Sequence, residues 1–286
     1  MLWISAAVFL IVVVLMATAI ARRRRTRETN DAEPRWGEPF VVVAGVLLPA
    51  VILVGVFVVS VRDMNAISRS GNGSTLTVQV VGRMWWWEAR YPGGAVTANE
   101  IHIPTGQPVR FEVSTADVIH SFWVPQLAPK IDMIPGRTNS VTVEADTPGR
   151  YRGQCAEFCG LQHANMAFFV VAQPLADFET WLRAEGTPAV APAESDAAAG
   201  MRVFLDSSCV GCHTIRGTDA DGSLGPDLTH LASRDTIAAG TLPNDAAVLE
   251  RWITDPQGVK PGADMPPTRL SPQDLRALVA YLESLG

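Results

Sequence analysis

Two long runs without a charged side chain constrain this chain more than any other feature. They cover residues 1–21 and 39–61, and each reaches the roughly 20 apolar residues that a helix needs to cross a bilayer. Pro49 lies inside the second run, and membrane-spanning helices tolerate proline. The chain is 48% hydrophobic and only 18% charged. These features predict a two-helix transmembrane hairpin over residues 1–62.

The segment between the two runs predicts the orientation. Six arginines lie between Arg22 and Trp36, and such positive loops stay in the cytoplasm. We therefore expect a multi-pass chain in a bacterial cell membrane, with both termini and everything after Val61 on the outer, periplasmic side. The first run could be a signal peptide, but such peptides carry positive charge before the apolar stretch. Here the arginines follow it, which favours an uncleaved helix.

Net charge and cysteine content exclude two other classes. The net charge of −6 argues against a nucleic-acid binder, which usually carries a basic face. Four cysteines in 286 residues are too few for a disulfide scaffold. All four lie in two short motifs, Cys155/Cys159 and Cys209/Cys212, which are therefore the candidate metal or cofactor sites.

Residues 74–173 alternate apolar and polar side chains in short runs. Val78 and Val80, for example, have polar neighbours, and turns rich in proline and glycine separate the runs. Many short strands with regular turns are typical of an all-β sandwich or barrel. His102 stands in one apolar strand, where a structural histidine is the better interpretation.

A short helix with Leu175, Phe178 and Leu182 on one side closes this domain, which is predicted to span residues 74–185. Residues 186–198 are rich in alanine and proline and lack large side chains. Such a composition indicates a semi-extended tether.

Four potential metal ligands lie within twelve residues of the β-rich segment. They are Cys155, Cys159, His163 and Met166, and His120 is available upstream. Zinc accepts cysteine and histidine equally well, and buried cysteine is often only a small hydrophobe. The methionine and the second histidine favour copper, whose sites combine soft sulfur with imidazole. A mononuclear site needs one thiolate, so the second one suggests two bridged metals.

The second cysteine motif is Cys209-Val-Gly-Cys212-His213, and Cys-x-x-Cys-His attaches c-type haem. A Cys-x-x-Cys pair can also be redox-active, as in thioredoxin-like proteins, but the adjacent histidine and the outer location favour haem. Met265 is the expected sixth ligand, since His/Met ligation is typical of cytochromes c. His230 is the competitor, and we interpret it as a surface or propionate-side residue.

Residues 199–286 are predicted to form an all-α domain. Ser271 can cap a closing helix in which Asp274 follows three residues later. Leu278 lies in its apolar stripe. We expect this closing helix to pack on an earlier helix around Phe204. A domain with such a helix pair resembles the class I cytochromes c.

Several stretches of the first 185 residues closely resemble subunit II of cytochrome c oxidase. The tryptophan-rich segment that begins at Met84 matches that family, as does the predicted helix pair. The most specific matches are residues 99–109, 117–127, 130–132, 134–139 and 151–166.

The resemblance implies an all-β cupredoxin-like barrel that holds the binuclear copper A centre. The implied side-chain ligands are His120, Cys155, Cys159, His163 and Met166. Glu157 would give its backbone carbonyl to copper and its carboxylate to a magnesium ion at the interface with the catalytic subunit. Trp85 would be the residue at which electrons enter, although Met84 and Trp86 replace the family's common Gln and Tyr. We expect the three tryptophans in one strand, with Trp85 and Trp87 on the same face.

Subunit II followed by a cytochrome c domain resembles the caa3-type oxidases. The resemblance implies that electrons come from a soluble or membrane cytochrome c donor and pass through haem c and copper A. They would then reach a haem-copper catalytic subunit I, which reduces oxygen to water. Other oxidase subunits would be further partners. A copper-A nitric oxide reductase would use a similar subunit. Nitrous oxide reductase also needs a large propeller, for which there is no room, and a copper-delivery module would need no haem motif.

Overall fold

The computed structural model describes residues 2–25, 37–69, 76–193 and 195–286. Residues up to Asn65 form one unit and residues from Ala66 form a second, and each is described by itself. Most of the arginine-rich loop and the predicted start of the β-rich domain at residue 74 lie outside the described residues, as does residue 194 of the predicted tether.

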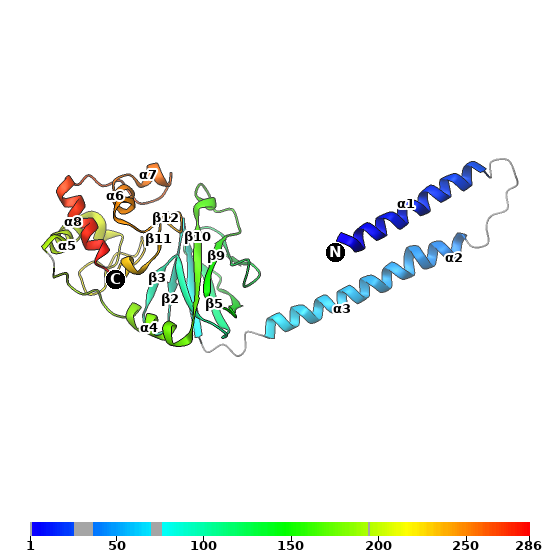
Figure 1. Cartoon of the computed structure of the whole chain (residues 1–286), viewed down its shortest axis with the longest axis horizontal. Coiled ribbons are helices and arrows are strands. Elements are labelled where there is room, and N and C mark those ends of the chain that lie inside the picture. Colours follow the sequence, from blue (N-terminus) through cyan, green and yellow to red (C-terminus); the bar gives the residue numbers. More distant parts are fainter. Residues whose placement is uncertain (1, 26–36, 70–75, 194) are drawn as a thin grey trace. The chain divides into compact units, whose positions relative to one another are not determined.

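The first unit is helical (Figure 1). It contains α1 (Leu2–Arg25), α2 (Gly37–Val42), the π-helical segment η2 (Val43–Leu47) and α3 (Leu48–Arg69). The π segment ends two residues before Pro49, which has a physical reason. Proline donates no N–H and its ring collides with the carbonyl four residues back, and π turns occur where the helical ladder is interrupted.

One apolar helix among the described residues, Pro39–Asn65, is long enough to cross a membrane. Its mean hydropathy reaches 3.0. The apolar part of α1 is the shorter stretch Ala6–Arg22. The second predicted span is therefore supported by length and composition, whereas the first span and the hairpin stay predictions.

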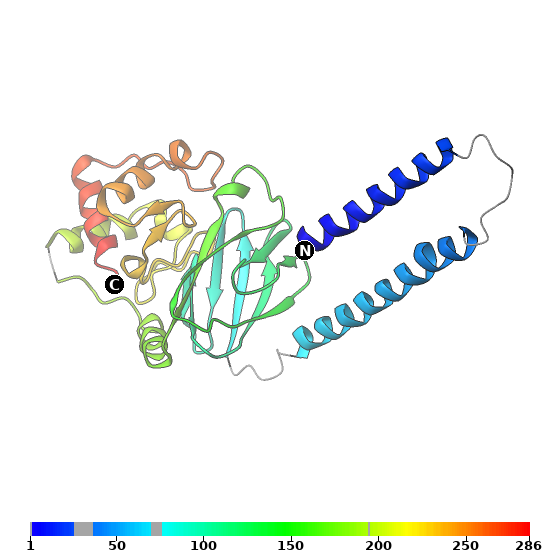
Figure 2. The same ribbon diagram turned by 45° about the vertical axis from the view of Figure 1, so that its right-hand side comes forward.

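Two five-stranded sheets form the β domain, the name used here for residues 76–185. Figure 2 shows its strands running side by side. The first sheet has the order β3 (Val96–Ala98), β2 (Trp86–Arg90), β1 (Leu76–Arg83), β5 (Val109–Thr115) and β8 (Asn139–Val143). The second has the order β4 (Glu100–Pro104), β10 (Ala167–Gln173), β9 (Gly149–Cys155), β6 (His120–Trp123) and β7 (Ile131–Met133).

Alternation along the strands builds the core between the sheets. Val78 and Val80 are fully buried while Gln79 between them is exposed, as the period of two requires. Aromatic side chains fill the centre, with Phe122 and Phe168 stacked at 4.7 Å between ring centroids. The predicted all-β, cupredoxin-like domain is confirmed.

The tryptophan segment departs from the prediction. Arg83 at the end of β1 pairs with Trp86 at the start of β2, so the chain reverses between them. Met84 and Trp85 form the turn, and the expectation that all three tryptophans share one strand is wrong. Trp85 and Trp87 are nevertheless both buried, with 9% and 0% of their surface exposed.

The helix α4 (Leu175–Glu185) closes the β domain as predicted, but its buried stripe differs. Leu175 is 44% exposed, so its assignment to that stripe is wrong. Phe178 is buried, and Trp181 packs against the core beside it. Trp181 carries the larger apolar ring, which makes its burial more favourable.

The helical domain, defined here as residues 195–286, follows. It contains α5 (Ser195–Leu205), η5 (Ser208–Gly211), η6 (Leu231–Ser233), β11 (Thr236–Ile237), β12 (Leu242–Pro243), α6 (Ala246–Thr254), α7 (Pro256–Val259) and α8 (Pro272–Glu283). The first residues of α5 fall inside the predicted tether, so the described tether is shorter than expected. The two-residue strands are a small addition to the all-α prediction.

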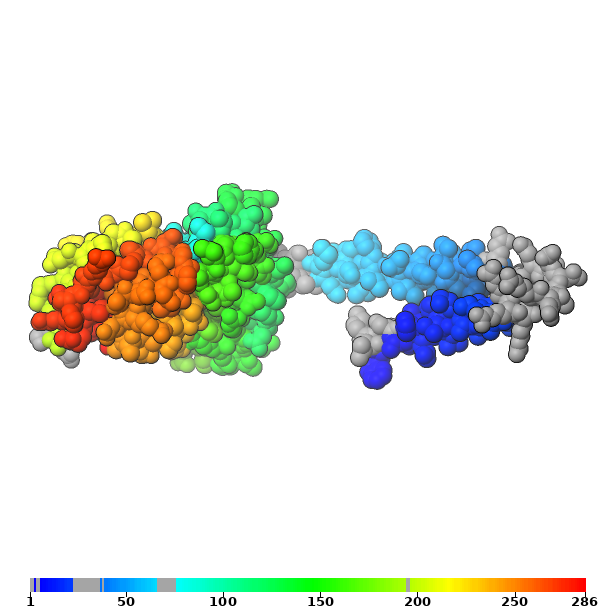
Figure 3. Space-filling model, turned by 90° about the horizontal axis from the view of Figure 1, so that it is seen from above, coloured from blue at the N-terminus to red at the C-terminus, as the bar shows by residue number. Residues whose placement is uncertain are grey.

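The N-terminal and C-terminal helices of this domain pack together. Phe204 of α5 meets Tyr281 of α8 edge to face, with ring centroids 6.1 Å apart. Ser271 accepts the Asp274 N–H at 3.1 Å and caps α8, as the sequence predicts. Within the second unit the helical domain lies directly against the β domain (Figure 3).

Candidate metal centres

Five side chains from separate parts of the β domain converge at one end of the second sheet. His120 begins β6, Cys155 ends β9, and Cys159 lies in the loop that follows. His163 is in the short helix η4 (His163–Asn165), and Met166 precedes β10. The Sγ atoms of the two cysteines are 3.8 Å apart. The predicted ligand set is therefore brought together in space.

The remaining distances complete the cluster. Nδ1 of His120 lies 3.8 Å from Sγ of Cys155. Sγ of Cys159 lies 3.6 Å from Nδ1 of His163 and 3.7 Å from Sδ of Met166. The ligand atoms of His120, Cys155 and Cys159 all lie within 4.8 Å of one another. Thiol, imidazole and thioether donors at this spacing fit a soft metal such as copper.

The electrostatics of the two thiols also favour a cation. A shared proton between the sulfurs and a hydrogen bond with His120 lower the pKa of Cys155 to about 3. The thiolate so formed, together with burial, raises the pKa of Cys159. A metal ion can replace the shared proton and stabilise both thiolates, because metal ligation deprotonates cysteine.

Asp117 is a functional residue that the sequence argument missed. Its Oδ1 lies 2.8 Å from Nε2 of His120, and its Oδ2 accepts the Met84 N–H at 2.7 Å. Carboxylate bonds of this kind fix the orientation of a metal-binding histidine. Burial disfavours the charged ring, but the bonds to Cys155 and Asp117 outweigh it and raise the pKa of His120. In the sequence, the position of Asp117 three residues before His120 was the signal that could have indicated this pairing.

The tryptophan turn is bonded to the same cluster. Nε1 of Trp85 donates to the backbone oxygen of Cys159 at 2.9 Å, and Nε1 of Trp87 donates to that of Met166 at 3.2 Å. Both indoles therefore touch the backbone of predicted ligands. The backbone oxygen of Glu157 lies 3.1 Å from Sγ of Cys155, while its side chain is exposed.

The second candidate centre lies in the helical domain. Cys209 and Cys212 are free, half-buried thiols on and just after the short helix η5. His213 follows, and its Nδ1 lies 2.8 Å from the backbone oxygen of Pro226. A backbone oxygen can only accept, so Nδ1 is the protonated nitrogen, and Nε2 would be the atom that binds a metal. Burial lowers the pKa of His213, which keeps the ring neutral and able to bind iron.

Close packing holds this histidine in place. A Cβ atom at Gly225 would lie 2.6 Å from Cε1 of His213, so only glycine fits there. The Gly225 N–H donates to the Cys212 oxygen at 2.7 Å. The loop that contains Gly225 therefore folds back on the attachment motif. The residues around the motif fit a covalently attached haem.

Met265 and His230 have different surroundings. Met265 is half-buried and packs against the same hydrophobic cluster as Cys209. His230 is only 6% exposed, and its Nε2 lies 3.0 Å from the backbone oxygen of Thr187. The interpretation of His230 as a surface residue is wrong, because the first residues after α4 cover it.

His102 lies apart from both centres. Its ring stacks on Trp181 at 4.0 Å between centroids, and its Nδ1 lies 2.9 Å from Oε1 of Gln173. These contacts give it a packing role.

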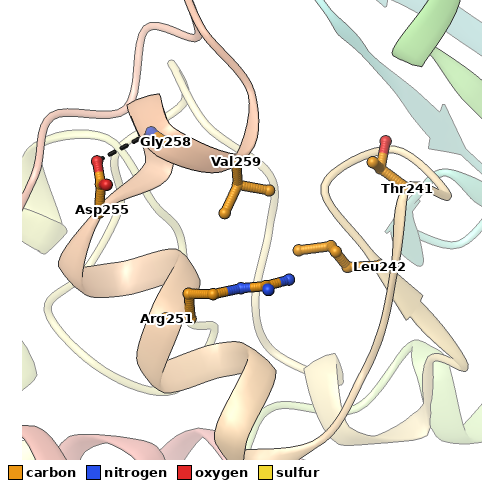
Figure 4. A pocket seen from close by; sticks show the side chains of 6 residues that line it. All are labelled: Thr241, Leu242, Arg251, Asp255, Gly258 and Val259. Atoms are coloured by element: carbon orange, nitrogen blue, oxygen red, sulfur yellow. Dashed lines mark hydrogen bonds between the residues drawn. The ribbon is translucent and has the colours of Figure 1, made fainter.

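A pocket of about 360 Å³ lies beside α6 and α7 (Figure 4). Its lining residues are Thr241, Leu242, Arg251, Asp255, Gly258 and Val259. Asp255 is occupied as a helix cap, because its Oδ1 accepts the Gly258 N–H at 2.9 Å. The lining contains no thiol or imidazole, the donor types that characterise the two candidate centres.

The fold and the two centres define a class of protein. A β sandwich with a sulfur-rich candidate metal site is joined to a helical domain with a haem-attachment motif, and both follow an apolar N-terminal unit in the chain. This combination is an electron-transfer protein of the membrane.

Comparison with known proteins gives the family. Residues 94–173 match the family model of the cytochrome c oxidase subunit II periplasmic domain, and residues 197–286 match that of cytochrome c. Cytochrome c oxidase subunit 2 of Alkalihalophilus pseudofirmus is 35% identical over 99% of this chain and 84% of its own length. The corresponding subunit of Bacillus subtilis is 29% identical over 95% of this chain and 82% of its own length.

A solved structure is also similar. It is the periplasmic domain of subunit II of cytochrome oxidase from Bradyrhizobium japonicum, with 31% identity, a TM-score of 0.39, and coverage of 40% of this chain and 96% of that one.

The chain belongs to the cytochrome c oxidase subunit II family, in the form that carries a cytochrome c domain. It is a subunit of a membrane-bound oxidoreductase complex, and electrons enter the complex through it. The cytochrome c domain implies haem, and the subunit II domain implies copper A.

Proposed function

We propose that this chain takes electrons one at a time from a c-type donor and delivers them to a haem-copper catalytic subunit that reduces oxygen to water. The observation that carries the proposal is the convergence of two thiols, two imidazoles and a thioether in the β domain. The helical domain adds the haem-attachment motif to the same chain. A tethered donor domain raises the effective concentration of donor at its acceptor without tight docking.

The residues proposed to hold the cofactors are those that the sequence predicts. For copper A they are His120, Cys155, Cys159, His163, Met166 and the backbone oxygen of Glu157. For haem c they are Cys209, Cys212, His213 and Met265. When bound, each group would accept and release single electrons. The side chains of His120 and Met166 are 0% and 1% exposed, so water is excluded from that side of the cluster.

The exposed carboxylate of Glu157 is proposed to bind magnesium at the interface with the catalytic subunit. A hard cation prefers carboxylate oxygen, and the side chain is free to reach outward from the loop. Trp85 is proposed as the point at which electrons reach the copper cluster, supported by its hydrogen bond to Cys159.

The proposed topology is a multi-pass anchor in residues 1–62, with both termini and both redox domains on the outer side of a bacterial cell membrane. The copper A domain is proposed for residues 74–185 and the cytochrome c domain for 195–286, because α5 begins at Ser195 inside the predicted linker 186–198. The haem-copper catalytic subunit, other oxidase subunits and a cytochrome c donor are the proposed partners.

Oxygen uptake tests the proposal. The complex is purified from its own membranes through a tag on this chain and supplied with reduced cytochrome c. We expect rapid, cyanide-sensitive uptake. A complex with reducible haem and copper but no uptake would contradict the oxidase assignment, and nitric oxide would then be the next substrate to supply.

A further inference from the structure

Three consecutive residues of the helical domain contact the β domain at the copper cluster. Nζ of Lys260 donates to the backbone oxygen of Trp85 at 2.8 Å. The backbone oxygen of Pro261 accepts from Nε2 of Gln162 at 2.7 Å. A Cβ atom at Gly262 would lie 2.9 Å from Cδ1 of Leu161. This docking segment, residues 260–262, therefore touches both the tryptophan turn and the loop that carries Cys159 and His163.

Lys260 is the unusual member of the docking segment. It is only 3% exposed, although lysine is almost never fully buried unless it is paired. Its Nζ donates to two backbone oxygens, that of Trp85 and, at 3.2 Å, that of Ala238. Burial accordingly lowers the pKa of Lys260 to about 8. Burial of an ammonium group costs desolvation energy, which hydrogen bonds to carbonyl oxygens only partly offset. The bond from Lys260 to Trp85 joins the two domains at this point.

The docking segment is also tied to the predicted haem ligand Met265. Oε1 of Gln257 accepts the Gly262 N–H at 2.8 Å, and its Nε2 donates to the backbone oxygen of Met265 at 3.2 Å. One side chain thus fixes the segment relative to Met265. A displacement of the segment from Trp85 would therefore also disturb the surroundings of Met265.

A second polar contact joins the domains elsewhere. The carboxylate of Glu100, which is 3% exposed, accepts the Thr236 N–H at 2.9 Å, the Thr236 hydroxyl at 2.8 Å and the Asp235 N–H at 3.2 Å. Arg150 of the β domain pairs with both Glu100 and Asp235. Two separated contacts restrict the relative orientation of the domains more than one contact would, because a single contact acts as a pivot.

We propose that Lys260 is a positioning residue that docks this chain's own helical domain on the tryptophan turn. The occupant of that surface is then the attached cytochrome domain, and an external donor has to deliver its electron to the helical domain. Trp85 is only 9% exposed in this arrangement, which supports the assignment. The proposal rests on the proposed function for its electron path, but the docking itself requires neither cofactor.

Hydrogen exchange on the purified complex tests the docking. The variant is Lys260→Met, which keeps an unbranched stem and removes the N–H donors. Lys130→Met, at an exposed lysine of the β domain, is the matched control. We expect the amides of residues 84–87 and 159–163 to exchange about tenfold faster in Lys260→Met, the scale of one lost hydrogen bond to a charged group. Lys130→Met should match the wild type.

Glu100→Gln provides a second, independent variant at the other contact. It should also accelerate exchange at the interface, and it decides the outcome if Lys260→Met fails to assemble. Wild-type exchange in both variants would overturn the proposal. Because this readout needs neither copper nor oxygen uptake, its failure is distinguishable from failure of the proposed function.

Transient electron transfer gives the functional readout. After flash reduction of the haem, one electron leaves the reduced haem and reduces the oxidised copper centre. We expect this transfer to be about tenfold slower in Lys260→Met, matching the loosened docking, with unchanged haem and copper spectra. A rate equal to that of Lys130→Met would overturn the positioning role.

Discussion

At the scale of single residues, hydrogen bonds decide which atoms face the proposed copper site. Asp117 holds Nε2 of His120, which turns Nδ1 toward Cys155. Gly82 gives the ring its space, because a Cβ atom there would lie 3.0 Å from Cδ2 of His120. The ligand is thus oriented by two residues that are not ligands themselves.

Asp117→Asn tests this orientation. The amide is a weaker acceptor than the carboxylate, so the imidazole should be less well held and less basic. We expect copper affinity to fall about tenfold or more, as for other partners of metal-binding histidines. Copper retention against a competing chelator measures it, with the exposed Asp146→Asn as control. Equal retention by the two variants would contradict the role of Asp117.

Gly225→Ala tests the corresponding packing at the second centre. The new Cβ would collide with the ring of His213, so either the ring or the loop must move. We expect at least a severalfold lower fraction of protein with correctly ligated haem, measured from the absorption spectrum, since small additions to tight packing force such shifts. Gly286→Ala, where a Cβ would lie at an ordinary 3.9 Å from Cβ of Ala232, is the control and should behave as wild type.

At the scale of elements, α4 is fixed to the β domain by an aromatic cluster. Trp181 stacks on His102 and meets Tyr91 edge to face with ring centroids 5.1 Å apart. The Tyr91 hydroxyl donates to the backbone oxygen of His102 at 2.9 Å. A neutral imidazole suits this stack, and burial lowers the pKa of His102.

This lowered pKa predicts a pH dependence. Below about pH 6.5, the ordinary value for histidine, the unfolded chain binds a proton that the folded chain resists binding. The free energy of unfolding should therefore fall as the pH decreases through that value. We expect denaturant unfolding between pH 7 and pH 5 to show a smaller loss in His102→Gln than in wild type. An identical loss in both would contradict the assignment.

At the scale of the whole molecule, the second unit contains two separate hydrophobic cores. One lies between the sheets around Trp87 and Phe122, and the other surrounds Phe204 and Tyr281. The proposed copper ligands Cys155, Cys159 and Met166 belong to the first core. Polar contacts, such as those of Glu100 and Lys260, join the domains. Each core can therefore respond separately to its own cofactor.

Copper removal should destabilise mainly the β domain. A ligand present at about a hundredfold its dissociation constant stabilises the folded state by about 2.7 kcal/mol. Depletion of copper should therefore lower the unfolding temperature reported by the tryptophans, while the transition reported by haem absorbance moves much less. Scanning with both signals measures this, and equal shifts would contradict separate cores.

The sequence alone predicts the parts of this protein that depend on local chemistry. The cysteine loop supplies Cys155 to Met166 within twelve residues, the haem motif is contiguous, and Ser271 caps a helix through a residue three positions away. The alternating strands identify the β domain, because a period of two places one face in the core. The ligand pattern of copper sites, together with the family resemblance, also predicts His120 as the second imidazole of the set.

Only the tertiary structure decided the contacts between distant segments. Trp85 lies in a turn because Arg83 pairs with Trp86, and His230 is buried because residues after α4 cover it. Lys260 reaches Trp85 across 175 positions of chain. Burial and hydrogen-bond partners of this kind depend on which surfaces meet after folding, and no local pattern of residues specifies that meeting.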